Sequence, residues 1–128
     1  TTRQISKKTL LPITTVHNRI RKLKKSGIIK RFTIDIDNAK IGRQFSAAIL
    51  VSCDYKALRD IKKDQHQLAK EISHMPEVEK ADIVTGGADM VVNVRVKDVN
   101  EFDSFLLKRL QKIQGVDKTQ SLVVIHET

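Results

Sequence analysis

The stretch Thr14–Phe32 reads TTVHNRIRKLKKSGIIKRF and predicts a single helix with two unlike faces. Apolar residues recur at intervals of three and four, which places them on one side of an α-helix. These residues are Ile13, Val16, Ile20 and Leu23. Gly27 follows the last turn, where a left-handed residue commonly ends a helix. We therefore expect a helix that packs by its apolar side and exposes hydroxyl, amide and cationic side chains on the other.

Positive charge is concentrated around this helix. Residues 1–43 carry 12 Lys and Arg and 2 Asp and Glu, whereas the other 85 residues carry 12 and 13. No acidic residue precedes Asp35, although exposed helices usually interleave acids with bases. A basic segment beside a neutral domain favours the phosphates of a nucleic acid as the partner. An anionic membrane surface is the weaker alternative, because the apolar stripe lacks the bulky aromatic residues of an interfacial helix.

A second, shorter helix is predicted from Arg3 to about Leu10. Leu11-Pro12 interrupts it, and proline is tolerated at the start of the helix that follows. Two short helices joined by a tight turn form a helix-turn-helix. The alternation after Gly27 predicts a strand that ends near Asp37. We expect residues 1–37 to be a helix-turn-helix domain with a following strand, 38–43 a linker, and 44–128 a second domain.

The second domain is predicted to be an α+β unit of ferredoxin-like type. The periodicity predicts the order β-α-β-β-α-β, with an antiparallel sheet and both helices on one face. The expected elements are strand 45–53, helix 65–75, strand 78–85, a turn at 86–89, strand 90–97, helix 99–113 and strand 116–125. Ala48, Leu50 and Val91 make the uncovered face apolar, which favours a two-fold dimer through two facing sheets.

The remaining composition narrows the class of protein. The single cysteine, Cys53, excludes an internal disulfide and fits a reducing, cytoplasmic compartment. We find no signal peptide and no apolar run of membrane-spanning length. The four histidines share no metal-ligand spacing, and no catalytic triad, phosphate loop or close carboxylate pair is present. We therefore predict no metal, no cofactor and no enzymatic activity.

Two motifs resemble the Lrp/AsnC family of feast/famine transcription regulators. The first is T-V-x-x-R-I-x-x-L-x-x-x-G-I-I at Thr15–Ile29. The second is MPEVEKADIVTGGADMVVNVRV at Met75–Val96, which is similar to the family's stretch around its G-x-x-D turn, and DKTQSLVVI at Asp117–Ile125 resembles its last strand. The resemblance implies a helix-turn-helix that binds duplex DNA. It also implies a second domain that dimerises, builds octamers in many members and often senses amino acids.

The chain departs from the family pattern at four points. Family members begin with a longer helix ahead of the helix-turn-helix; here that helix has been removed or is disordered, or the DNA-binding module is incomplete. Leu10 stands where the family usually has a turn glycine, and Pro12 where it usually has a capping serine. Ala88 stands where many members have an aromatic residue, so we expect either a different chemistry of the effector pocket or a loss of the effector response.

The candidate DNA-binding residues lie on the second helix. Its first two turns would enter the major groove, where Asn pairs with adenine and Arg with guanine, while later cations would hold phosphates. The base-reading candidates are Thr14, Thr15, His17, Asn18 and Arg19; the phosphate candidates are Arg21, Lys22 and Lys25. A plain solvated basic face is the structural alternative, and Arg19 has a structural or phosphate-binding role as its own alternative.

The candidate effector residues come from the resemblance. It implies that Thr85, Gly86, Gly87 and Asp89 line a cleft between dimers, with Thr119 and Ser121 nearby. Backbone at glycines and one carboxylate would bind the two ends of an amino acid. The structural alternative is a hairpin turn in which glycine supplies positive φ and aspartate caps the backbone.

These observations predict a sequence-specific DNA-binding transcriptional regulator that responds to an amino acid or a related effector. An RNA-binding protein on a ferredoxin-like sheet is one alternative, but such sheets need exposed aromatics and aromatic content here is 4%. A freestanding amino-acid sensor is the other alternative, and it would leave the basic residues 1–43 without a role.

Overall fold

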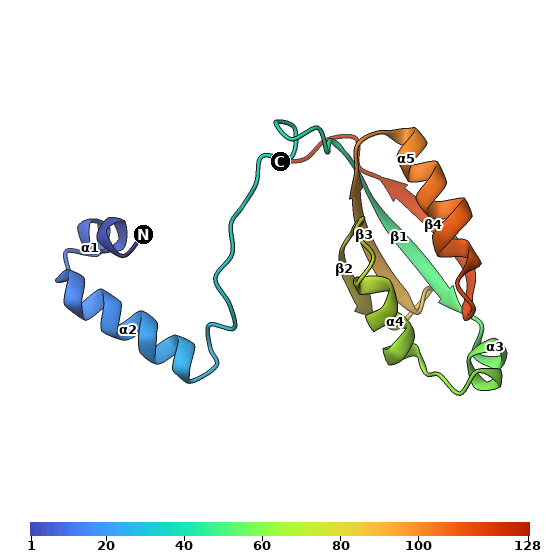
Figure 1. Ribbon diagram of the computed structural model, residues 1–128, viewed down its shortest axis with the longest axis horizontal. Coiled ribbons are helices and arrows are strands. Elements are labelled where there is room, and N and C mark those ends of the chain that lie inside the picture. The colour runs from blue at the N-terminus through green and yellow to red at the C-terminus, as the bar shows by residue number, and fades with distance from the viewer. The chain divides into compact units, whose positions relative to one another are not determined.

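Two helices open the chain in the computed structural model, which describes residues 1–128 (Figure 1). Helix α1 spans Thr2–Thr9 and helix α2 spans Ile13–Lys25. Thr1 begins α1 with a capping box that includes Gln4, and Leu10 ends it in the left-handed conformation at φ 58°. The chain divides into two units, Thr1–Ile36 and Asp37–Thr128. Val16 is the one fully buried residue of the first unit, at 3% exposure.

The strand predicted after Gly27 is absent, and this prediction was wrong. Residues 28–37 form no regular element, and Ile28, Phe32 and Ile34 are 71%, 66% and 78% exposed. A strand is stable only when a neighbour pairs with its backbone groups, and this unit contains no second extended segment. Lys24 holds the segment beside α2: its ammonium group donates to the carbonyl of Lys30 at 2.7 Å and lies over the Phe32 ring.

The second unit confirms the ferredoxin-like fold. Four antiparallel strands pair in the order β2-β3-β1-β4, and helices α4 and α5 cover one face of the sheet (Figure 1). The strands are β1 Phe45–Cys53, β2 Val78–Ile83, β3 Met90–Val96 and β4 Val116–Val123. The main helices are α4 Gln65–Ser73 and α5 Val99–Asp103, and the latter continues as a π-helical turn, η1 Ser104–Arg109, and a 3-10 turn, η2 Leu110–Lys112.

The core lies between the sheet and these helices. Alternate residues of β1 and β3 point toward the helices, because successive strand side chains lie on opposite faces. Ile49, Val92 and Ile72 are among the side chains with no exposed surface. Asp98 begins α5 by accepting the backbone N–H of Glu101.

The element bounds differ from the predictions at several places. Strands β2 and β4 each end two residues early, and the predicted helix 99–113 is α-helical only as far as Asp103. A further helix, α3, spans Tyr55–Asp60 where a connection was predicted. Its six residues are too few to display helical periodicity, and tertiary packing stabilises it instead. Leu58 of α3 is buried beside Gly115, where a Cβ atom would lie 2.4 Å from Leu58 Cδ2.

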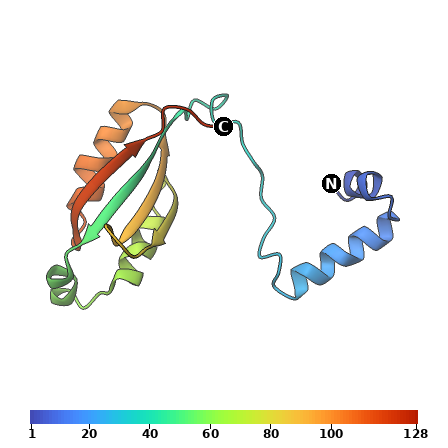
Figure 2. The same ribbon diagram turned by 180° about the vertical axis from the view of Figure 1, so that it is seen from behind.

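The opposite face of the sheet carries no helix (Figure 2). The register places its side chains in three rows across the strands. They are Asp82, Val91, Leu50 and Gln120; Lys80, Asn93, Ala48 and Leu122; and Arg95, Ser46 and Val124. We call this surface the open face. Its middle is apolar, and Leu122 and Val124 are 49% and 42% exposed.

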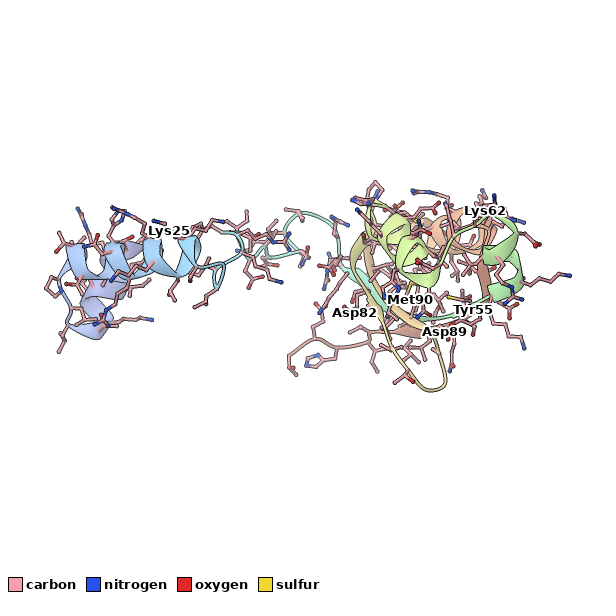
Figure 3. The ribbon with its side chains drawn as sticks, turned by 90° about the horizontal axis from the view of Figure 1, so that it is seen from below. Lys25, Tyr55, Lys62, Asp82, Asp89 and Met90 are labelled. Carbon is pink, nitrogen blue, oxygen red and sulfur yellow. The ribbon has the colours of Figure 1, made fainter.

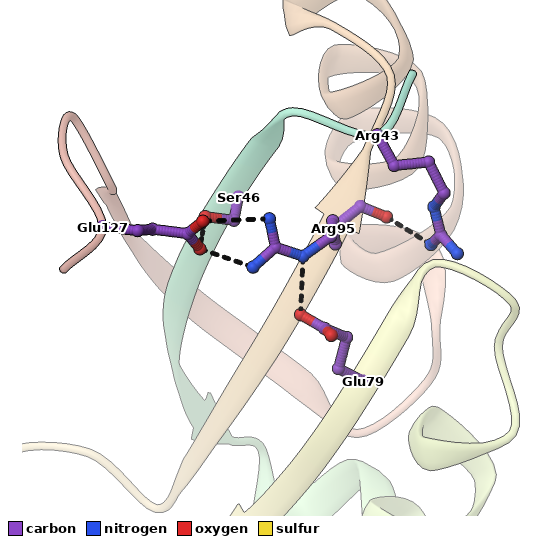
Figure 4. A network of polar contacts seen from close by, with 5 residues as sticks. All are labelled: Arg43, Ser46, Glu79, Arg95 and Glu127. Atoms are coloured by element: carbon purple, nitrogen blue, oxygen red, sulfur yellow. Dashed lines mark hydrogen bonds and ion pairs between the residues drawn. The ribbon is translucent and has the colours of Figure 1, made fainter. Parts of the chain in front are cut away.

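An ion-pair network closes one end of the open face (Figure 4). Arg95 is 11% exposed and pairs with Glu127 at 2.5 Å and with Glu79 at 3.2 Å. The Arg43 side chain donates to the Arg95 carbonyl at 2.6 Å, which anchors the start of the second unit to β3. The guanidinium of Arg95 lowers the pKa of Glu127, because it donates hydrogen bonds to that carboxylate.

Candidate DNA-binding surface and effector hollow

The outward surface of α2 is free of acidic partners. Residue spacing on an α-helix places Thr14, Asn18, Lys22 and Lys25 opposite the buried Val16, and all four are exposed. Thr15 and Arg19 flank this surface on one side. All five salt bridges of the structure lie in the second unit, so none involves an α2 cation. The cations of this surface are therefore available to a polyanion.

A groove on α2 is bordered by two of the predicted DNA-binding residues. His17 and Arg21 border a groove of about 540 Å³ that is also lined by Ile5, Ile20 and Phe32. This groove runs along the side of α2 that faces α1. Helical spacing still places Arg21 on the outward surface, about 140° around the helix from Val16, whereas Arg19 lies at the flank, only about 60° from Val16. His17 lies at the flank on the other side, where it borders the groove.

The predicted turn between β2 and β3 is present and is tied to the end of β1. The N–H of Val84 donates to the carbonyl of Asp89, and the N–H of Asp89 donates to the carbonyl of Val51. Gly86 has φ 127°, a conformation that disfavours any other residue. Thr85 and Gly86 are exposed at the tip of the turn.

Asp89 bonds within its own chain through both carboxylate oxygens. Oδ2 accepts the backbone N–H of Cys53 at 2.8 Å, and Oδ1 accepts the Tyr55 hydroxyl at 3.0 Å. Asp89 and Tyr55 are labelled in Figure 3. The Tyr55 hydroxyl also lies 2.9 Å from Gln65 Oε1 at the start of α4. The hydrogen bond to Asp89 raises the pKa of Tyr55, and burial together with the Asp89 charge raises the pKa of the Cys53 thiol. Asp89 therefore links the turn to β1 and α3.

A hollow of about 280 Å³ opens on the open face beside this turn. We call it the turn hollow. It is lined by Leu50, Ser52, Gly87, Ala88, Lys118, Thr119 and Gln120. Two of the predicted effector residues, Gly87 and Thr119, line it. The hydroxyl of Thr119 itself accepts a hydrogen bond from Gln111 of η2, and Ser121 pairs with Ile49 on the helix-covered face.

Ala88, expected from the resemblance to belong to the effector pocket, also lines the hollow, whereas Leu50, Ser52, Lys118 and Gln120 were not predicted as effector residues. Leu50 and Gln120 are register partners on neighbouring strands, and Ser52 follows Leu50 on the same face of β1. Alternation along β1 and β4 places these residues on the same face of their strands. Only the pairing of the two strands shows that they lie next to each other. Lys118 lies opposite the β1 irregularity between Val51 and Cys53, which no local pattern predicts.

Two other kinds of site are absent from the structure. No group of three or more His, Cys, Asp and Glu side chains is arranged to hold a metal ion. None of the helices has the length and apolar character needed to cross a bilayer.

Family comparisons cover almost the whole chain. Residues 46–128 match the Lrp/AsnC ligand binding domain, and residues 1–30 match a winged helix-turn-helix DNA-binding domain. The HTH-type transcriptional regulator FL11 of Pyrococcus horikoshii is 37% identical over 124 residues, which are 96% of this chain and 76% of the relative. The FL11 regulator of Pyrococcus furiosus is 33% identical with the same coverage of both chains.

Solved structures share the fold. The transcriptional regulator NMB0573 of Neisseria meningitidis, in complex with L-Met, has a TM-score of 0.81 at 23% identity. The alignment covers 99% of this chain and 79% of the NMB0573 chain. AsnC of E. coli has a TM-score of 0.76 at 21% identity, with 98% and 80% coverage.

Proposed function

The chain belongs to the Lrp/AsnC family of DNA-binding transcriptional regulators, and from this premise we propose which of its surfaces bind DNA, effector and a second copy. The outer surface of α2 binds duplex DNA. The open face binds a second copy of the chain. The turn hollow binds an amino-acid effector. The RNA-binding and freestanding-sensor alternatives are not favoured, because the relatives are helix-turn-helix transcriptional regulators.

The absence of acidic partners on α2 carries the DNA-binding proposal. Exposed cations without ion pairs keep their full charge for phosphates, and phosphate binding releases counterions from DNA. Asn18 and Arg19 lie in the second turn of α2, within the part of a recognition helix that contacts base edges. Lys22 and Lys25 lie farther along the same surface and would contact phosphates without reading sequence.

The apolar middle of the open face supports the dimer. A sheet needs a cover on both sides when both of its faces are apolar, and α4 and α5 cover only one. Ala48, Leu50 and Val91 are half-buried in the isolated chain, and Leu122 and Val124 are more exposed. A two-fold partner that presents the same face would bury all five.

The turn hollow is the site proposed for the effector. It combines open backbone at Gly87 and Ala88 with polar side chains and one apolar residue, Leu50. The structural neighbour from Neisseria meningitidis was solved with L-Met, which supports an amino acid as the class of ligand. Asp89 would hold the turn in place through Cys53 and Tyr55 rather than contact the effector directly.

Selection from a random pool of duplexes tests the proposal. The full chain should enrich a defined DNA sequence, and its affinity should fall steeply as salt concentration rises. Repeating the selection with each of the amino acids should identify one or a few that change the amount of bound DNA. Failure to bind any duplex at low salt would contradict the assignment of α2.

A further inference from the structure

We propose that the turn hollow selects ligands with net negative charge and two carboxylates, and that Lys118 sets this preference. The ligand class is an acidic amino acid or a small dicarboxylic acid. This inference rests on the proposed effector function of the same hollow. Its basis is the set of charges and hydrogen-bond donors that line the hollow.

Lys118 is the one ionisable side chain in the lining. It is exposed, and it forms no salt bridge and no side-chain hydrogen bond in the structure. Other cations of the open face are already paired: Arg95 with Glu79 and Glu127, and Lys80 with Asp82. Lys118 is therefore the cation that this face leaves for a ligand.

The nearby carboxylates are not available to a cationic ligand. Asp89 accepts hydrogen bonds from Cys53 and Tyr55 and does not line the hollow. Asp82 lies in the same row as Leu50, two strands away, and pairs with Lys80 at 3.5 Å. A lysine or arginine ligand would have to leave water without gaining an anionic partner, which is unfavourable.

The remaining polar groups of the hollow add hydrogen-bond donors. The backbone N–H groups of Gly87 and Ala88 have no acceptor within the chain. The Ser52 hydroxyl and the Gln120 amide are likewise without a partner in the chain. Adjacent unpaired N–H groups and an ammonium group are typical of carboxylate-binding sites. Leu50 supplies an apolar surface for a short aliphatic spacer between two carboxylates.

Isothermal titration of the full chain tests the inference with matched ligands. L-Aspartate and L-glutamate are compared with L-asparagine and L-glutamine, which have nearly the same shape without the second negative charge. L-Lysine is the cationic ligand, and glutarate is a dicarboxylate without an ammonium group. We expect at least one acidic amino acid or glutarate to bind about tenfold or more tightly than its neutral counterpart, and L-lysine not to bind.

Variants of Lys118 assign the preference to the hollow. Lys118→Gln should reduce the advantage of the acidic ligand to about threefold or less, and Lys118→Arg should retain it. Lys112→Gln removes the same charge from η2, outside the hollow, and should leave the advantage unchanged. Equal binding of glutarate and glutamate would identify a dicarboxylic acid site, and tighter binding of glutamate an amino-acid site; both support the inference.

Two outcomes would overturn the inference and separate it from the proposed function. Preferential binding of a neutral or basic amino acid, or an acidic preference that survives in Lys118→Gln, would refute the charge assignment while the effector function stands. Binding of none of these ligands or of any other amino acid, by a chain that still binds duplex DNA, would refute the effector function and the inference together.

Discussion

The Tyr55 hydroxyl lies 3.0 Å from one carboxylate oxygen of Asp89, and the other oxygen accepts the Cys53 N–H at 2.8 Å. One carboxylate thus joins three segments: the turn before β3, the end of β1 and the first turn of α3. Tyr55 is 46% exposed, so water competes for this hydrogen bond. The contact positions the turn that borders the hollow, and it has a spectroscopic signature.

Tyrosinate absorbance will report the Tyr55–Asp89 hydrogen bond directly. Tyr55 is the one tyrosine of the chain, and there is no tryptophan. Hydrogen bonding to Asp89 raises the pKa of Tyr55 above its ordinary value near 10. Because the folded-state pKa is raised, the contribution to stability is complete below about pH 10 and is lost as pH rises through the folded-state pKa.

We expect the folded chain to titrate above about pH 10 and the chain unfolded in guanidinium chloride to titrate near 10. Asp89→Asn should bring the folded value down toward the unfolded one. Identical midpoints for the folded wild type and Asp89→Asn would show that the hydrogen bond does not form in solution.

Double substitutions on α2 should separate base reading from phosphate binding. Asn18→Ala with Arg19→Ala should lower the preference for the selected duplex over random duplex by about tenfold to a hundredfold. Lys22→Ala with Lys25→Ala should weaken binding to the selected and the random duplex by the same factor. It should also reduce the magnitude of the slope of log affinity against log salt concentration by roughly two. Fluorescence anisotropy at several salt concentrations measures both quantities. Matching losses in the two double variants would contradict this division.

Substitution on the open face should dissociate the proposed dimer. Leu122→Lys places a charge where a facing sheet would exclude water, so the chain should sediment as a monomer. Val99→Lys is the matched control, because Val99 is 60% exposed on α5 at the covered side of the sheet. An unchanged sedimentation coefficient for Leu122→Lys would show that the dimer does not form through the open face.

Gly115→Ala should destabilise the second unit. The added Cβ would lie 2.4 Å from Leu58 Cδ2, and Gly115 has φ 107°. Backbone strain and overpacking together should lower the free energy of unfolding by about 2–4 kcal/mol. Gly87→Ala is the control, since a Cβ added at Gly87 would have no atom within 4 Å and its φ is outside the left-handed region. Urea unfolding followed by circular dichroism compares the two, and similar midpoints would refute the packing argument.

Leu10→Gly should stabilise the helix-turn-helix. Leu10 ends α1 at φ 58° and is 91% exposed, so it has backbone strain without compensating burial. Glycine relieves that strain, and we expect a gain of up to about 1 kcal/mol. Leu10→Ala keeps a side chain in the same conformation and should give no gain. Hydrogen exchange of the α1 amides in the full chain is the measurement; slower exchange in Leu10→Ala than in Leu10→Gly would contradict the strain argument.

Local periodicity accounts for the parts of the fold that were predicted correctly. Met90–Val96 alternates because the helices cover one side of β3. Ile13–Leu23 repeats at helical spacing and forms α2 as predicted, but of its four apolar residues only Val16 is buried, and Ile13 and Leu23 are 48% and 37% exposed. Helix α3 was missed because Leu58 is its one buried residue, and a single buried residue has no periodicity. The strand predicted after Gly27 failed because strand-like alternation does not supply the pairing partner that a strand requires.

The candidate sites also contain residues that local sequence patterns identified and residues that only the tertiary structure brought together. Thr14, Asn18, Lys22 and Lys25 were identifiable because a single helix places them together, and helical spacing is a property of the sequence. Lys118 and Ser52 are far apart in the chain, and only the pairing of β1 with β4 brings them to one hollow. Asp89 was singled out from the turn motif, whereas its partners Tyr55 and Cys53 depend on where α3 docks.

The amino-acid sequence by itself determined the helix-turn-helix, the strand and helix order of the second unit, the basic charge of α2 and the family. The first three follow from spacing along one segment or from composition, because local geometry depends on residues close together in the chain. The family follows from motifs that resemble those of known members. Only the tertiary structure decided which carboxylates are already paired, which donors stay unpaired and therefore which charge the turn hollow offers a ligand. Those properties depend on distances between segments far apart in the chain, and strand register and helix docking set such distances.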